Sequence, residues 1–86
     1  MEPARVIVRP YVTEKALMLA EKNNVLTLIV DRKATKPQIK AAVEKLYGVK
    51  VKKVNAVIAP TGEKKAYVRL AEGFSAIDVL TRLGAL

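Results

Sequence analysis

The most continuous hydrophobic run of the 86-residue chain covers residues 25–30, Val-Leu-Thr-Leu-Ile-Val, and is followed by Asp31. In an extended segment successive side chains point to opposite faces, so this run places apolar groups on both faces. A strand with two apolar faces is typical of the interior of a sheet that is covered on both sides. We therefore predict a strand over 25–31 in the middle of the sheet.

Apolar residues at helical spacing follow this strand. They form one stripe, which we expect to face the sheet, and consist of Ile39, Ala42, Val43, Leu46 and Tyr47. Thr35 and Gln38 have the spacing of a capping box, and Gly48 follows as the expected C-terminal stop. The charged residues off the stripe are Lys36, Lys40, Glu44 and Lys45, and we expect the lysines to face solvent or a ligand.

Two further helices are predicted, over residues 14–22 and 76–83. Thr13 and Ser75 precede them as N-cap residues, whose hydroxyls can accept a hydrogen bond from the first helical turn. Asn23-Asn24 ends the first of these helices.

The remaining pattern indicates strands. Residues 5–9, Arg-Val-Ile-Val-Arg, form a short run with basic ends before Pro10, which predicts a short strand. Residues 49–59 form a longer strand, and the turn cluster 60–63 joins it to a strand over 64–71 as an antiparallel hairpin.

The inward-facing positions of strand 49–59 change phase. Val49 and Val51 are expected to face the core at first, followed by Val54, Ala56 and Ile58. A change of phase within one strand requires an extra residue, so the sequence predicts a β-bulge at Lys52-Lys53.

These elements occur in the order β-α-β-α-β-β-α. We expect an α+β fold with a four-stranded antiparallel sheet, helices packed on its faces and a short C-terminal helix. No repeat or linker divides the chain, so residues 1–86 are expected to form one domain.

Composition restricts the function. Sixteen Lys and Arg against eight Asp and Glu give a net charge of +8, which attracts polyanions such as nucleic acid. The chain has no Cys or His and one serine, Ser75, so the usual nucleophiles, general bases and metal ligands are lacking. We expect a soluble intracellular protein, not an enzyme, with no cofactor, metal, small-molecule substrate or membrane span.

Several polar side chains on the hairpin are suited to RNA. Lys50 and Lys52 alternate with valines and are expected on the outer face, as phosphate contacts or as an ordinary solvated surface. Asn55 is either a contact to a base edge or sugar hydroxyl, or a buried amide bonded to backbone. Tyr67 and Arg69, two residues apart on one face, are suited to stacking and phosphate contact.

Three motifs resemble one family. They are Pro-Tyr-Val-Thr-Glu-Lys-Ala at 10–16, the segment 49–55, and Lys-Lys-Ala-Tyr-Val-Arg-Leu-Ala at 64–71 followed by Val79. In these residues the chain resembles family twenty-three of the universal large-subunit ribosomal proteins. The resemblance implies a cytoplasmic ribosomal constituent that binds 23S-type rRNA beside the polypeptide exit tunnel, touches neighbouring ribosomal proteins and offers a docking surface.

The turn at 60–63 is shorter than the long hairpin of bacterial members, so the chain resembles the archaeal form. That resemblance shifts the expected docking partners toward signal recognition particle and other exit-site factors. The high Lys content of the chain and its low Gln and Cys content also suit a protein from a thermophile.

Candidate residues follow from charge placement and from these motifs together. The expected RNA contacts are Arg9, Thr13, Lys15, Lys36, Lys40, Lys50, Lys52, Lys53, Asn55, Lys64, Lys65, Tyr67 and Arg69. The expected protein-docking residues are Glu21, Glu63, Glu72 and Asp78.

Two other function classes remain. A free regulatory RNA- or DNA-binding module would use the same basic face. A small phosphate-processing enzyme would need a glycine-rich anion loop, whereas the glycines here are isolated, at 48, 62, 73 and 84.

Overall fold

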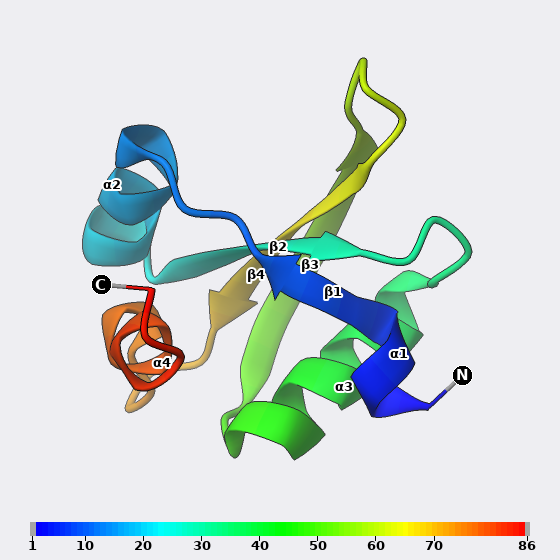
Figure 1. Cartoon of the computed structure of the whole chain (residues 1–86). Helices are drawn as coiled ribbons and strands as arrows, with labels where there is room; N and C mark the ends of the chain where they lie inside the picture. Colours follow the sequence, from blue (N-terminus) through cyan, green and yellow to red (C-terminus); the bar gives the residue numbers. More distant parts are fainter. Residues whose placement is uncertain (1, 86) are drawn as a thin grey trace.

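The computed structural model describes residues 2–85, and within them the chain forms a four-stranded antiparallel sheet with four helices (Figure 1). The elements are α1 (Pro3–Val6), β1 (Ile7–Pro10), α2 (Glu14–Asn23), β2 (Val25–Val30), α3 (Lys36–Tyr47), β3 (Val51–Ile58), β4 (Lys64–Leu70) and α4 (Ala76–Arg82). The strand order is β1-β2-β4-β3. The predicted α+β class, the antiparallel sheet and the short C-terminal helix are confirmed.

Strand β2 lies in the interior of the sheet, as its two apolar faces predicted. Leu26, Leu28 and Val30 point to the inner face and pack in the hydrophobic core with residues of α1, α3 and α4. Thr27 and Ile29 point to the opposite, outer face and are also buried, at 3% exposure each. The helices α1, α3 and α4 all lie on the inner side, and α2 lies beside β2 at one end of the sheet (Figure 1). Strand β2 is therefore buried on both faces, as its sequence predicted, although α1, α3 and α4 cover only the inner one.

Helix α3 has the capping box that its sequence predicted. The Thr35 N–H donates to Gln38 Oε1 at 2.9 Å, and the Gln38 N–H donates to Thr35 Oγ1 at 3.4 Å. Gly48 ends the helix with φ +67°, in the left-handed region that glycine adopts without strain.

The stripe of α3 is buried over most of its length. Ile39, Ala42 and Val43 are in the core and Tyr47 is half-buried against it, but Leu46 is 46% exposed. The prediction that Leu46 is a core residue was wrong. Leu46 lies in the last turn of α3, at the margin of the helical layer, where a side chain on the stripe that faces the sheet is not necessarily covered.

The N-terminal segment differs from the strand predicted over 5–9. Pro3–Val6 is a single helical turn, α1, in which the N–H groups of Arg5 and Val6 donate to the Glu2 carbonyl, and the strand begins at Ile7. Proline at the first helical position favours such a turn, and Val6 is thereby buried to 1% exposure in the core. A run of five residues is too short to distinguish these two conformations.

The predicted bulge in β3 is confirmed. Val51 is opposite Leu70 and Lys53 is opposite Arg69, so Lys52 is the extra residue. The Val51 N–H donates to Glu44 Oε2 of α3 at 2.9 Å. Glu44 is therefore half-buried and bonded to the backbone of the next strand, a contact that the sequence did not predict.

Both ends of the predicted strand 49–59 require correction. Val49 is buried as expected but precedes the strand, which begins at Val51. Ile58 points to the inner face, opposite Lys64, yet it is 53% exposed. The end of the hairpin extends beyond the helices, which leaves this inward-facing residue uncovered (Figure 1).

The two remaining helices each begin at a polar side chain, and α2 also ends at one. Thr13 Oγ1 accepts from the Ala16 N–H at 3.1 Å, and Ser75 Oγ accepts from the Asp78 N–H at 3.2 Å, so both predicted N-caps are confirmed. Asn24 ends α2 with φ +57°.

Asn24 also connects distant segments. Its Nδ2 donates to the Phe74 carbonyl at 2.7 Å, and its Oδ1 accepts from the Ala76 N–H at 2.8 Å. One side chain thus holds the start of α4 against the end of α2. The sequence predicted only that Asn24 ends a helix.

Candidate nucleic-acid interface

The outer face of the sheet carries side chains in three cross-strand rows. Residues directly opposite each other in an antiparallel pair point to the same face. In the first row Arg9, Ile29, Lys65 and Val57 follow one another across β1, β2, β4 and β3. The second row contains Thr27, Tyr67 and Asn55, and the third contains Val25, Arg69 and Lys53. Basic side chains from three of the four strands therefore point to one face.

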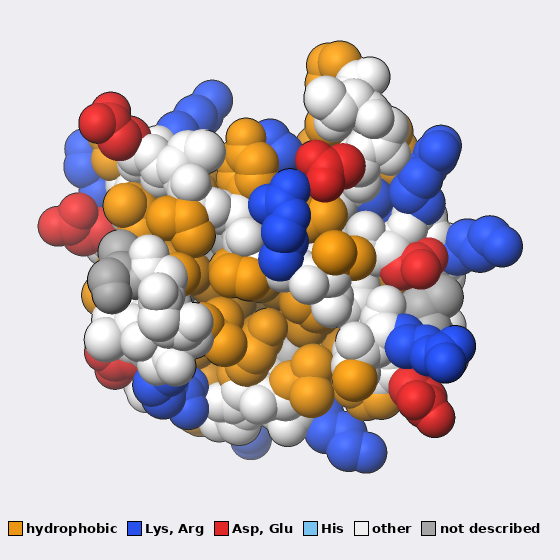
Figure 2. Space-filling model, viewed as in Figure 1, with side chains coloured by type: hydrophobic (Ala, Val, Ile, Leu, Met, Phe, Trp, Pro, Cys, Tyr) orange, Lys and Arg blue, Asp and Glu red, His pale blue; other side chains and the backbone are white. Residues whose placement is uncertain are grey.

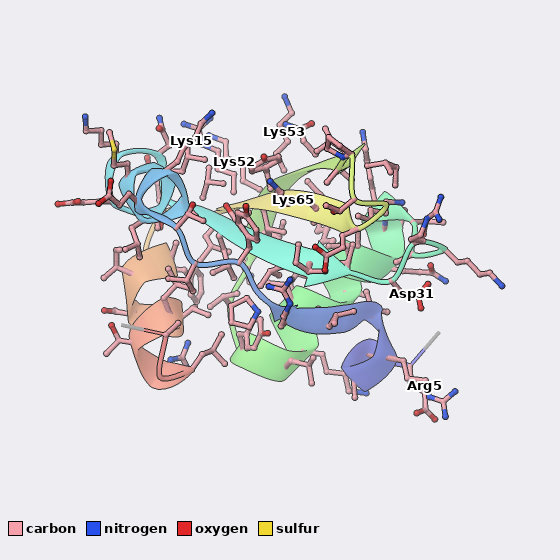
Figure 3. The ribbon with its side chains drawn as sticks, turned by 45° about the horizontal axis from the view of Figure 1, so that its top comes forward. Arg5, Lys15, Asp31, Lys52, Lys53 and Lys65 are labelled. Carbon is pink, nitrogen blue, oxygen red and sulfur yellow. The ribbon has the colours of Figure 1, made fainter. Side chains whose placement is uncertain are left out.

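This face is on the side of the sheet away from α1, α3 and α4. Figure 3 shows Lys15, Lys53 and Lys65 directed to that side from α2, β3 and β4, while Arg5 and Asp31 lie at the other end of the molecule. On the face of the molecule that Figure 2 shows, hydrophobic side chains gather in the middle, and Lys and Arg side chains lie mainly around the rim. The basic groups are thus distributed unevenly over the surface.

Two adjoining hollows follow the border between α2 and the outer face. The first, of about 120 Å³, is lined by residues that include Tyr11, Lys15, Thr27 and Lys65, and the second is lined by Lys53, Asn55 and Arg69 among others. Both hollows include Leu19 and Tyr67. Among residues 2–85 no acidic side chain lines either hollow, so these residues bring no negative group that would repel a phosphate.

Asn55 is exposed on the strand, opposite Tyr67. The alternative of a buried amide bonded to backbone was therefore wrong. Tyr67 is half-buried and Arg69 is exposed, and both line the second hollow together with Asn55. Their polar groups are positioned to contact a ligand on the outer face.

Thr13 and Lys15 belong to the first hollow. Thr13 Oγ1 caps α2 by accepting from the Ala16 N–H, which leaves the hydroxyl proton available as a donor. Lys15 lies in the first turn of α2 and is exposed. Both residues therefore border the outer face from the side.

A second basic cluster lies around the free edge of β3. A hollow there is lined by residues that include Lys36 and Lys40 of α3 and Lys52 and Lys53 of β3. Lys53 belongs to this hollow and to the outer face, so the positive surface continues around the edge strand. Lys50 is exposed in the segment between α3 and β3.

Lys64 is not on the outer face. It points to the inner face opposite Val30 and Ile58, and its Nζ donates to the Ala34 carbonyl at 2.6 Å. A half-buried ammonium with a backbone partner is less available to RNA than the exposed lysines.

Arg9 has an acidic neighbour on the hairpin. Its Nη2 is 3.0 Å from Glu63 Oε2, with side-chain exposures of 50% and 44%, and this is the only ion pair within residues 2–85. A half-exposed pair contributes about 0–1 kcal/mol, so it opposes contact of Arg9 with a phosphate only weakly. The same bond places Glu63 beside the outer face.

The other acidic candidates lie elsewhere. Glu21 of α2, Glu72 before α4 and Asp78 of α4 are exposed. Helices α2 and α4 contact each other, so Glu21 and Asp78 come from neighbouring elements. Over residues 2–85 no group of three or more carboxylates is arranged to hold a metal ion, and no helix is long and apolar enough to cross a bilayer.

Sequence analysis missed two residues of this interface, Tyr11 and Thr27. The Tyr11 ring lies under Lys65 Nζ, which is 4.2 Å from the ring centroid, and both residues line the first hollow. Its position two residues after Arg9 continues the alternation of β1, and that signal could have identified it. Tyr47, by contrast, packs against the core, where burial raises its pKa above the ordinary value of 10.0.

Comparison with known proteins relates most of the chain to one family. The family model described as Ribosomal protein L23 matches residues 5–67. The Large ribosomal subunit protein uL23 of the archaeon Pyrobaculum aerophilum is 62% identical to the chain over 81 residues. That alignment covers 94% of the chain and 100% of the relative.

Proposed function

The chain belongs to the ribosomal protein L23 family and is thus a structural constituent of the large ribosomal subunit in the cytoplasm; we propose that it binds 23S-type rRNA through the outer face of its sheet. The high identity to the Pyrobaculum protein supports the archaeal type. The tight β3–β4 turn supports it too, with hydrogen bonds from Ala59 N–H to the Glu63 carbonyl and from Gly62 N–H to the Ala59 carbonyl. The role is non-enzymatic, without cofactor, metal or small-molecule substrate, and the whole chain 1–86 acts as one rRNA-binding domain.

One observation carries the RNA-binding proposal. Of the four helices only α2 borders the outer face, and Lys53, Lys65 and Arg69 lie on this face without an acidic partner within 4.0 Å among residues 2–85. Phosphate contacts supply most of the affinity of such proteins, because each contact releases counterions from the nucleic acid. Two tyrosines and one amide are too few for a platform that stacks many bases, so shape and backbone charge dominate recognition.

The candidate contacts differ in position. Lys53, Asn55, Lys65, Tyr67 and Arg69 form the centre of the interface, with Thr13 and Lys15 at its border. The more distant contacts are Arg9, Lys36, Lys40, Lys50, Lys52 and Lys64, and the backbone bond of Lys64 makes it the weakest of them.

We further propose the position that the family resemblance implies, beside the polypeptide exit tunnel. There the chain contacts neighbouring ribosomal proteins and offers a docking surface to signal recognition particle and other exit-site factors. The proposed docking residues Glu21, Glu63, Glu72 and Asp78 are exposed acidic groups away from the centre of the RNA-binding face, and Glu63 is paired with Arg9.

Filter binding tests the RNA-binding proposal. The purified chain is titrated against a large-subunit rRNA transcript and against tRNA at equal salt. Preference for the large-subunit transcript supports the proposal, and equal affinity for both RNAs contradicts it.

Sedimentation separates ribosome assembly from a free module. Tagged protein in a native extract is run on gradients at low and at raised salt. Co-migration with the large subunit at both salt concentrations supports the ribosomal role. Protein that stays in the soluble pool would favour the free regulatory RNA- or DNA-binding module.

A further inference from the structure

The hollow between the start of α2 and the outer face is lined largely by aromatic and apolar side chains. Its walls are the aromatic rings of Tyr11 and Tyr67 and the apolar side chains of Ala16 and Leu19, and Thr27 also lines it. Its volume is about 120 Å³. Aromatic and apolar walls around a small space favour a flat, weakly polar ligand over a hydrated ion.

Thr27 supplies an unused polar group at this place. The residue is 3% exposed, and its Oγ1 is buried with no hydrogen-bond partner among the described residues. Most buried side-chain polar atoms in proteins have a partner, because an unpaired one loses its hydration without compensation. A ligand edge with a donor or an acceptor would pair this hydroxyl, which can act as either.

Positive charge surrounds the hollow. Lys65 Nζ lies 4.2 Å from the centroid of the Tyr11 ring, Lys15 lies on the same border, and no lining residue is acidic. A ligand that combines a flat ring with an adjacent anion satisfies the walls, the hydroxyl and the ammonium groups together. A nucleotide within an RNA strand has these properties.

We propose that this hollow receives one unstacked base of the bound RNA. The base lies against the Tyr11 ring, its edge pairs with Thr27 Oγ1, and its flanking phosphates contact Lys15 and Lys65. The proposal rests on the proposed rRNA binding, and the adjoining hollow with Lys53, Asn55 and Arg69 continues the path of the same strand.

The test uses the full chain with two variants of the hollow, Thr27→Val and Tyr11→Leu. Thr27→Val keeps the size and branching of the side chain and removes only the hydroxyl. Thr61→Val is the matched control, because Thr61 is exposed in the β3–β4 turn and outside the hollow. The probe is a large-subunit rRNA transcript, treated with reagents that together report the accessibility of all four bases.

At saturating protein we expect the wild type and Thr61→Val to protect one unpaired base. That base becomes reactive in complexes of Tyr11→Leu and Thr27→Val, while backbone protection elsewhere is retained. Affinity is expected to fall about tenfold for Tyr11→Leu, from lost stacking, and about threefold to tenfold for Thr27→Val.

Transcript binding with the same protected bases in all four proteins would overturn the inference and leave the proposed function standing. Unchanged affinity of Tyr11→Leu and Thr27→Val for the transcript would also overturn the inference, and it would favour a protein side chain as the occupant of the hollow. Failure of the wild type to bind the transcript above its affinity for tRNA would contradict the proposed function and the inference together.

Discussion

Thr27 and Asn24 are two buried or half-buried polar residues with opposite hydrogen-bonding states. Asn24 uses both ends of its amide, whereas Thr27 Oγ1 has no partner within the described residues. The first arrangement stabilises the fold, and the second costs stability unless a ligand completes it. The two residues therefore predict mutational effects of opposite sign on the free energy of unfolding.

Thr27→Val is expected to stabilise the free protein by about 1 kcal/mol, because a methyl group replaces a buried hydroxyl that has lost its hydration. Urea denaturation of the RNA-free protein measures this change. Thr61→Val, on the exposed turn, is expected to change the midpoint very little. A loss of stability in Thr27→Val would show that the hydroxyl is already paired in the free protein.

Asn24→Gly is expected to destabilise the fold by about 2 kcal/mol, since the Phe74 carbonyl and the Ala76 N–H both lose their partner. Glycine retains the left-handed backbone of this position, where φ is +57°. Asn24→Ala adds the strain of that backbone and should lose about 1 kcal/mol more. Thermal denaturation of both variants tests whether Asn24→Ala is the less stable one. Equal stability of the two variants would contradict the strain expected for alanine in the left-handed backbone of this position.

At the level of elements, the sequence predicted helix ends and the bulge most reliably, because the residues that cause each of these features lie within one short segment. The capping box of Thr35 and Gln38 and the N-caps of α2 and α4 each lie within four residues, and all are present. The bulge in β3 was visible as a change of phase in the valine pattern.

What the sequence could not predict depends on contacts between distant segments. The burial of Val6 requires the position of α1 against α3, and the exposure of Ile58 requires knowledge of where the helices end. The hollow with Tyr11 and Thr27 forms only when α2 is placed beside the outer face. Their positive charge made Lys53, Lys65 and Arg69 candidates for RNA contact. That the three side chains lie on one face follows only from the strand register in the structure.

The bulge of β3 depends on helix α3 through Glu44. Glu44→Ala removes the acceptor of the half-buried Val51 N–H and is expected to destabilise the fold by about 1–2 kcal/mol. Glu44→Gln retains an acceptor oxygen and should lose less. Chemical denaturation compares the two variants, and equal losses would show that the carboxylate charge, and not the hydrogen bond, is what matters.

For the molecule as a whole, the net charge of +8 matters through its distribution. The inner side of the sheet carries the core, and the outer face and the edge of β3 carry lysines and arginines, of which only Arg9 has an acidic partner within 4.0 Å among the described residues. Lysines elsewhere, such as Lys22, Lys33 and Lys45, contribute to the same net charge from exposed sites outside this surface. The proposed RNA binding thus predicts that removing the same number of positive charges has a larger effect on RNA affinity at the outer face than elsewhere on the surface.

The salt dependence of rRNA binding tests this claim most directly. The outer-face variant Lys53→Gln/Lys65→Gln/Arg69→Gln is compared with the matched control Lys22→Gln/Lys33→Gln/Lys45→Gln, which loses the same three charges. Each phosphate contact on a duplex contributes about 0.9 to the slope of log K against log salt. We expect the outer-face variant to lose about 2–3 units of slope and the control to retain the wild-type slope. Equal slopes for the two variants would contradict RNA binding by the outer face of the sheet.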